Sequence, residues 1–105
     1  MALTRDFKET IRARVTADPA FRSALLSEAV ERFVSGDVDA GRSILRDYIN
    51  ATIGFEALGS AADIPPKSLM RMFGPKGNPR ADSLFKVISV LQEKTGVQLA
   101  VGVAA

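Results

Sequence analysis

The sequence contains no cysteine and no histidine, and this absence excludes several classes of chemistry at once. Without these residues a protein has no thiol nucleophile, no histidine-based catalytic triad and no conventional structural zinc site. The sequence also contains no cofactor-binding glycine loop and no convergent pair of acid and base residues. We therefore expect a protein that is not an enzyme, with no catalytic residues, no cofactor and no bound metal.

Long apolar runs are missing as well. No stretch approaches the roughly 20 apolar residues that are needed to span a membrane. Residues 1–6 contain no apolar segment of the kind that a secretory signal carries. The chain has 105 residues, of which 47% are hydrophobic and 25% are charged, so it has room for one domain with its own core. We expect a compact cytoplasmic domain with no membrane partner.

Apolar residues recur at spacings of three and four, which predicts helices through most of the chain. Thr4, Asp18 and Asp37 are suited to N-cap positions, and Gly36 and Gly96 are suited to helix C-termini. These signals predict six helices, which cover residues 4–17, 19 to the stop at Gly36, Asp37 to just before Gly54, 55–62, 66–73 and 81–95. The predicted fold class is all-α.

Tyr48 is the only tyrosine in the chain. It shares a helical stripe with three apolar residues, Ile44, Leu45 and Ile49. A tyrosine in such a stripe places its ring in the core and usually keeps its hydroxyl in water. We expect Tyr48 to be a core residue with a solvated hydroxyl.

The C-terminal residues have a different period. Val97, Leu99, Val101 and Val103 alternate with polar or small residues, which predicts a single β-strand over residues 97–105. No other segment alternates in this way, so the strand has no partner within the chain. The same strand of a second copy is the nearest candidate, and the pairing would produce a homodimer. Two alternatives remain: the tail packs against the last helix, or it joins a sheet in another protein.

The two short helices at residues 55–62 and 66–73 form a unit. Small residues on the first helix would let the second cross close by, as a helix-turn-helix requires. The expected packing residues of the first helix are Leu58, Gly59, Ala61 and Ala62. Ile64 in the turn is suited to filling the core between the helices, and the expected inner face of the second helix is Leu69, Met72 and Phe73.

The second helix of this unit and the loop after it are basic. Residues 65–80 carry four basic side chains and no acidic one, whereas residues 1–62 carry eight basic and nine acidic side chains. A short helix with an apolar back and a basic front fits the major groove of DNA, while loop residues can hold the backbone. The candidate DNA-binding residues are Lys67, Ser68, Met70, Arg71, Lys76, Asn78 and Arg80. The alternative is a helical hairpin with ordinary exposed basic residues.

Several motifs together resemble a known family. They are Asp18-Pro19 at a helix start, the turn from Leu58-Gly59 to Ile64, Lys67-Ser68-Leu69, the specific Gly77-Asn78-Pro79, and the segments 84–87 and 97–101. On these motifs, residues 18–101 resemble the addiction-module antidote proteins, antitoxin-type regulators of the lambda-repressor-like helix-turn-helix superfamily. The resemblance implies a transcriptional repressor that binds double-stranded operator DNA, controls its own toxin–antitoxin operon and has a small toxin protein as a partner.

We expect one compact domain with three parts. Residues 1–36 would form an N-terminal helical extension packed on the core, residues 37–96 the helix-turn-helix domain and residues 97–105 the strand or tail. The sequence departs from the family pattern at Asp63, where glycine is common, at Pro65-Pro66, and in residues 3–17, which would form an additional N-terminal helix. Because proline has no backbone N–H, the second departure removes two donors that could contact phosphate. The alternative function is a protein-interaction module that keeps this fold and does not bind DNA.

Overall fold

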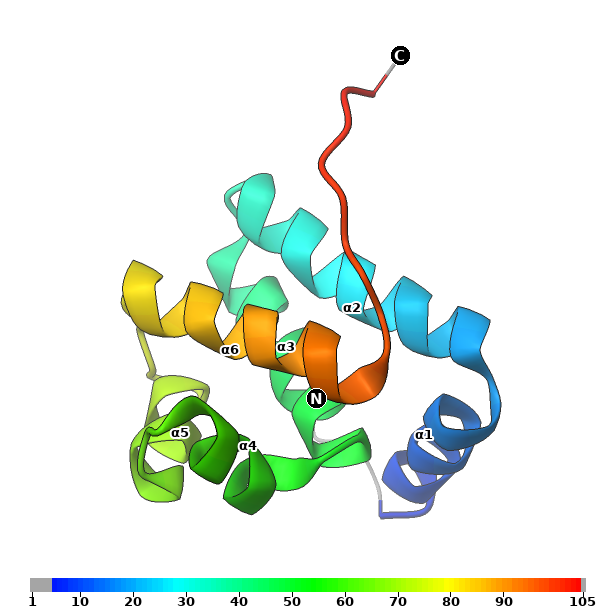
Figure 1. Ribbon diagram of the computed structural model, residues 1–105, viewed down its shortest axis with the longest axis horizontal. Coiled ribbons are helices and arrows are strands. Elements are labelled where there is room, and N and C mark those ends of the chain that lie inside the picture. Colours follow the sequence, from blue (N-terminus) through cyan, green and yellow to red (C-terminus); the bar gives the residue numbers. More distant parts are fainter. Residues whose placement is uncertain (1–4, 105) are drawn as a thin grey trace.

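The computed structural model describes residues 5–104 as a bundle of six helices (Figure 1). The helices are α1 (Arg5–Ala17), α2 (Pro19–Val34), α3 (Val38–Ala51), α4 (Gly54–Ala62), α5 (Pro66–Met72) and α6 (Ala81–Thr95). These bounds lie within one or two residues of the predicted ones, and the all-α class is confirmed for this part of the chain. The N-cap predicted at Thr4 lies outside the described residues.

Local signals determine where the helices begin and end. The Asp18 carboxylate accepts hydrogen bonds from the backbone N–H groups of Ala20, at 3.0 Å, and Phe21, at 3.2 Å. Asp37 caps α3 in the same way through the N–H of Ala40. Gly36 and Gly96 have positive φ angles, which follow the ends of α2 and α6. The predicted caps and stops at these four positions are confirmed, because each depends only on neighbouring backbone.

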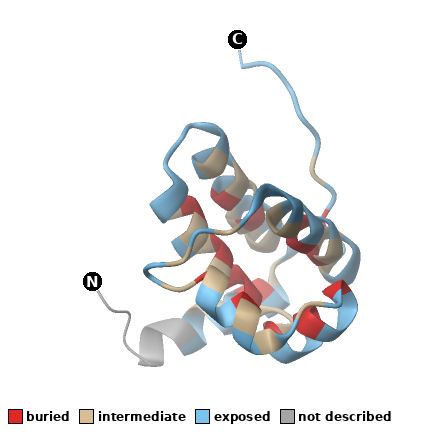
Figure 2. Ribbon diagram, turned by 90° about the vertical axis from the view of Figure 1, so that its left-hand side faces the viewer, coloured by how far each residue is buried: buried red, intermediate tan, exposed pale blue. Residues whose placement is uncertain are grey.

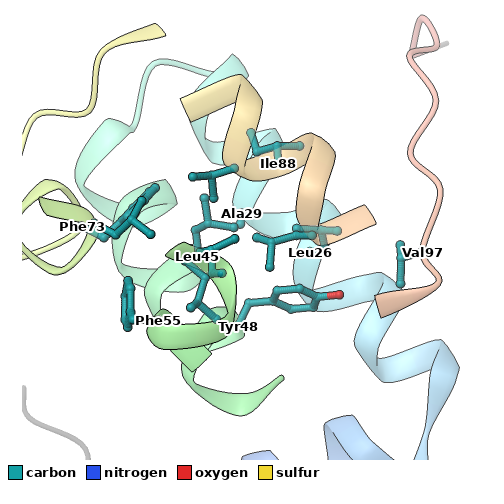
Figure 3. Close-up of a cluster of buried hydrophobic side chains, with 13 residues drawn as sticks. Leu26, Ala29, Leu45, Tyr48, Phe55, Phe73, Ile88 and Val97 are labelled. Carbon is teal, nitrogen blue, oxygen red and sulfur yellow. The ribbon is translucent and has the colours of Figure 1, made fainter. Parts of the chain in front are cut away.

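Helices α2, α3 and α6 form the main scaffold, and their apolar faces meet in one cluster (Figure 3). Close packing of α2 on α3 depends on Gly41, since a Cβ there would lie 2.9 Å from the ring of Phe33. The unit made by α4 and α5 adds Phe55 and Phe73 to one side of the cluster. The buried cluster consists of Leu26, Ala29, Leu45, Tyr48, Ile49, Phe55, Leu58, Leu69, Phe73, Val87, Ile88, Leu91 and Val97.

Tyr48 is buried in this cluster together with its hydroxyl group. Its hydroxyl lies 2.5 Å from Oγ1 of Thr95, and the Thr95 hydroxyl donates to the carbonyl oxygen of Leu91 at 2.6 Å. Because the single hydroxyl proton of Thr95 is used in this way, the Tyr48 hydroxyl is the donor to Thr95. The predicted core position is confirmed, but the expected solvated hydroxyl is wrong. Burial raises the pKa of Tyr48 above its ordinary value.

Helix α1 packs against α2 and α3 at one end of the bundle (Figure 1). Val15 is its buried anchor. Arg12 donates from Nη2 to the carbonyl oxygen of Asn50 at 3.1 Å, and Arg22 on α2 donates from Nη1 to the carbonyl oxygen of Val15 at 2.9 Å. Among the described side chains, Val15, these two guanidinium groups and Arg14, which lies over the ring of Phe21 at 4.5 Å, therefore fasten the helix to the scaffold.

The tail after α6 has no regular secondary structure, and residues 5–104 contain no strand. Val97 is buried and Leu99 is half-buried, with its N–H bonded to Oε1 of Gln92 at 2.9 Å. Beyond this point the tail leaves the body of the protein, and Val101 and Val103 are fully exposed (Figures 1 and 2). The predicted strand is thus absent from the single chain, because its backbone groups have no second strand to pair with. The alternative, in which the tail packs on the last helix, holds for residues 97–99.

Candidate nucleic-acid interface

Helix α4 joins α5 through a three-residue turn at positions 63–65. Asp63 adopts the left-handed conformation, with φ 56°, and its N–H and that of Ile64 both point to the carbonyl oxygen of Gly59. Gly59 is also where the two helices approach most closely. A Cβ at this position would lie 2.7 Å from the carbonyl oxygen of Ile64 and 3.0 Å from Cγ of Pro66. The predicted close crossing at Gly59 is confirmed.

The inner face of this unit joins the main core. Leu58, Ala62, Leu69 and Phe73 are buried, and two further apolar residues, Ile64 and Met72, are half-buried and pack against the cluster. The prediction for Ala61 is wrong, because this residue is exposed. The buried stripe of α4 consists of positions 55, 58, 59 and 62, and at 100° per residue position 61 falls outside it.

The outer face of α5 carries Lys67, Met70 and Arg71, at the spacing of three and four that brings side chains together on a helix. All three are exposed, and 47% of the Met70 surface faces solvent. Lys67 and Arg71 make no ion pair with any residue in the described range. Ser68, also predicted for this face, is half-buried at its margin. The helix therefore presents two cations without ion-pair partners and an exposed apolar thioether beside them.

The loop between α5 and α6 folds back onto the end of α5 at Gly77. Its N–H donates to the carbonyl oxygen of Gly74 at 2.9 Å. A Cβ on Gly77 would be driven into the carbonyl oxygen of Met72 and would lie 2.5 Å from that of Arg71. No side chain fits at this position, so the path of the loop depends on glycine being there.

Arg42 on α3 holds the same loop from the other side. Its Nη1 donates to the carbonyl oxygen of Gly77 at 2.8 Å and its Nη2 to that of Pro75 at 2.9 Å. Asp39, one helical turn earlier, lies 3.1 Å from Nη1 and orients the guanidinium group. Only 11% of the Arg42 side chain is exposed. The loop is thus fixed to the scaffold by a pair of charge-assisted hydrogen bonds.

Sequence reasoning missed Arg42. Its acceptors are backbone carbonyls 33 and 35 residues away, and a carbonyl leaves no trace in the side-chain sequence. The nearby Asp39 is a local signal, but a pair three residues apart is equally typical of an ordinary solvated helix face. No feature of the sequence therefore distinguished Arg42 from the other surface arginines.

The loop that Arg42 holds presents three candidate residues, Lys76, Asn78 and Arg80, and all three are exposed. Arg80 lies 3.6 Å from Asp82, but both side chains are more than 70% exposed, and such a surface pair contributes little energy. All four predicted cations of residues 65–80 are therefore accessible to a large anion. We call the outer face of α5 together with this loop the basic surface; its members are Lys67, Met70, Arg71, Lys76, Asn78 and Arg80.

Residues 5–104 contain no group of three or more acidic, cysteine or histidine side chains that could hold a metal ion. None of the helices in this range is long and apolar enough to cross a membrane.

Comparison with family models, with curated proteins and with solved structures finds no match to this chain. The resemblance to antidote proteins therefore stays a prediction that rests on the motifs quoted above.

Proposed function

We propose that this protein is a sequence-specific DNA-binding regulator, in which α4 and α5 act as a helix-turn-helix and α5 enters the major groove. The observation that carries the proposal is the basic surface. Its helix exposes Lys67 and Arg71 without acidic partners, and its loop is held in place by Arg42. A fixed arrangement of cations around a protruding helix is suited to the regular phosphate spacing of duplex DNA.

The two parts of the basic surface would have different roles. Lys67 and Arg71 project from the helix that enters the groove, so each would contact base edges as well as a neighbouring phosphate. Lys76 and Arg80 lie on the loop, so they would contact phosphates and set the register of the helix on the duplex. Met70 lies beside Lys67 on the same outer face and would meet the apolar 5-methyl group of thymine, which the major groove exposes.

The regulated genes are proposed from the resemblance alone. An antidote protein represses its own operon, so the operator would lie directly upstream of this gene, and a small toxin would be a second partner. A homodimer would present two copies of α5 to two half-sites about one helical turn apart on the DNA.

A second candidate function, a protein-interaction module, is favoured by the start of α5. Pro65 is the N-cap residue and Pro66 is the first helical residue, and no side chain caps this end. Two prolines remove backbone N–H groups that many DNA-binding helices direct at phosphate. In this case the same exposed residues, Met70 among them, would contact a protein.

Fluorescence anisotropy with the duplex immediately upstream of the gene tests the proposal and separates the two candidates. Arg71→Ala should weaken binding to the preferred duplex by about 1–3 kcal/mol if the arginine makes a bidentate contact with guanine. Lys94→Ala, which removes an exposed cation of α6, is the matched control and should leave the affinity unchanged. Equal losses on preferred and random duplexes would contradict base reading by Arg71. No binding to any duplex at low salt would favour the interaction module.

A further inference from the structure

Helix α6 exposes an aromatic side chain on the face that points away from the core. Phe85 is 65% exposed, and no other helix is drawn over α6 in Figure 1. A single exposed aromatic residue is common on protein surfaces and needs no explanation by itself. What distinguishes Phe85 is a hollow further along the same face. This hollow measures about 540 Å³ and is lined by Ser89, Gln92, Glu93, Gly96, Val97 and Gln98.

The projecting side chain and the hollow lie in one line along α6. Phe85, Ser89, Gln92 and Gly96 are spaced at intervals of four, three and four residues, which places them on one face of a helix. The buried residues Val87, Ile88 and Leu91 lie on a different face of α6, which turns toward the core. Ser89, the small residue between the projection and the hollow, is the point at which another helix can approach closely.

We propose that this face binds the same face of a second copy of the chain, with the two α6 helices antiparallel and crossing at Ser89. A two-fold axis at Ser89 places positions equally distant from it opposite each other. Phe85 then lies opposite the partner's Glu93, at the hollow, and the partner's Phe85 enters the hollow of the first copy. One symmetric contact therefore places the Phe85 side chain of each copy in the hollow of the other.

The charges beside this line complement each other in the antiparallel arrangement. Lys86 and Glu93 are both exposed and lie on the same flank of α6, since seven residues return to nearly the same helical angle. Rotation about an axis at Ser89 brings Lys86 of each copy next to the partner's Glu93. These two pairs of opposite charge support the antiparallel arrangement.

This contact is a different dimer from the one predicted through the tail. In an antiparallel pair the tails leave from opposite ends, and Val101 and Val103 do not meet their counterparts. The proposal deepens the homodimer of the proposed function but does not require DNA binding, so the two can fail separately.

Sedimentation equilibrium of the full chain tests the contact. We expect a dimer at micromolar concentration. Phe85→Asp should raise the dissociation constant by about a hundredfold or more, because two phenyl groups per dimer lose their buried environment. Val34→Asp is the matched control, since Val34 is 83% exposed and lies at the end of α2, away from this face. The control should remain a dimer.

A charge exchange tests the register. Lys86→Glu and Glu93→Lys should each weaken the dimer several-fold, and the double variant should recover most of the loss. A wild-type chain that is monomeric at roughly 100 µM would overturn the proposal, and so would a dimer that Phe85→Asp leaves unchanged. A double variant no better than the single variants would overturn the antiparallel register. Anisotropy with duplex DNA, measured on the same variants, reports the proposed function separately.

Discussion

The scaffold and the unit formed by α4, α5 and the loop after them are held together in different ways. In the scaffold of α2, α3 and α6, buried side chains such as Leu26, Leu45 and Leu91 fill the space between helices. Residues 54–80 also bury side chains such as Leu69 and Phe73, but the path of their turn and loop depends on backbone contacts. Gly59 and Gly77 bring two chain segments within contact of carbonyl oxygens, and Arg42 binds two further carbonyls.

This difference separates stability from function. Removing atoms from the scaffold leaves a cavity, which lowers the free energy of unfolding. A side chain added at a close backbone contact in residues 54–80 would displace the loop. The basic surface would then lose its geometry even if the fold persists. Substitutions in the two regions should therefore be distinguishable by comparing unfolding with DNA affinity.

The largest expected effect lies in the scaffold. Leu45→Ala should lower the free energy of unfolding by about 2–5 kcal/mol, since Leu45 is fully buried. Urea unfolding followed by circular dichroism measures this loss. Val38→Ala, at a partly exposed position of the same helix, should change stability little. A Leu45→Ala loss as small as that of the control would contradict the role assigned to the scaffold core.

Gly77→Ala should be the most damaging single-methyl addition in the loop. The added Cβ meets carbonyl oxygens of α5, so the loop must move, at about 1–3 kcal/mol of stability. DNA affinity should fall further than stability alone explains, because Lys76 and Asn78 move with the loop. Gly102→Ala has open space around it and serves as the control. Unchanged stability and affinity in Gly77→Ala would show that the loop adapts easily.

Arg42→Met tests whether the scaffold positions the basic surface. Methionine keeps part of the aliphatic packing and removes both hydrogen bonds to the loop, so unfolding should become easier by about 1–3 kcal/mol. Binding to duplex DNA should weaken although Arg42, being largely buried, contacts no phosphate itself. Asp39→Ala, which leaves both hydrogen bonds in place, should have a smaller effect on both quantities. A variant with normal DNA affinity would separate the loop anchor from the function.

Tyr48→Phe removes a polar contact within the scaffold, and we expect it to have the smallest effect on stability among these variants. Near neutral pH the loss of one hydrogen bond should lower stability by about 0.5–1.5 kcal/mol. Burial raises the pKa of Tyr48 in the folded state, so the unfolded chain loses the phenol proton first. The stability that the protonated Tyr48 side chain contributes is therefore fully present below about pH 10 and is lost as the pH rises above it.

Because Tyr48→Phe has no phenol to ionise, its stability should fall less at alkaline pH than that of the wild type. Because Tyr48 is the only tyrosine, the ultraviolet absorbance of its phenolate reports on this residue alone. An absorbance titration that matches free tyrosine would contradict the raised pKa.

The boundaries of the helices could be predicted because their causes are local. Asp18 and Asp37 cap the helices that directly follow them, and Gly96 ends the helix directly before it. The outer face of α5 was also predictable, since periodicity alone separates Lys67 and Arg71 from the buried Leu69.

Features that depend on distant parts of the chain could not be predicted. Arg42 bonds to carbonyls more than 30 residues away, and the buried hydroxyl of Tyr48 finds its hydrogen-bond acceptor in Thr95, on another helix. For the tail, the sequence predicts an element that the single chain does not form. Its alternating pattern indicates a strand, but a strand forms only with a partner, and a pattern cannot show whether one is present. The exposure of Phe85 could not be predicted either, because a single aromatic residue forms no periodic pattern.

The salt dependence of DNA binding tests the central claim most directly. If the four cations of the basic surface neutralise about four phosphates, log affinity should fall against log salt with a slope of about −3.6. In Lys76→Ala/Arg80→Ala the slope should fall to about −1.8, because two phosphate contacts are lost. Equal slopes for the two proteins, or an affinity that does not change with salt, would contradict the account.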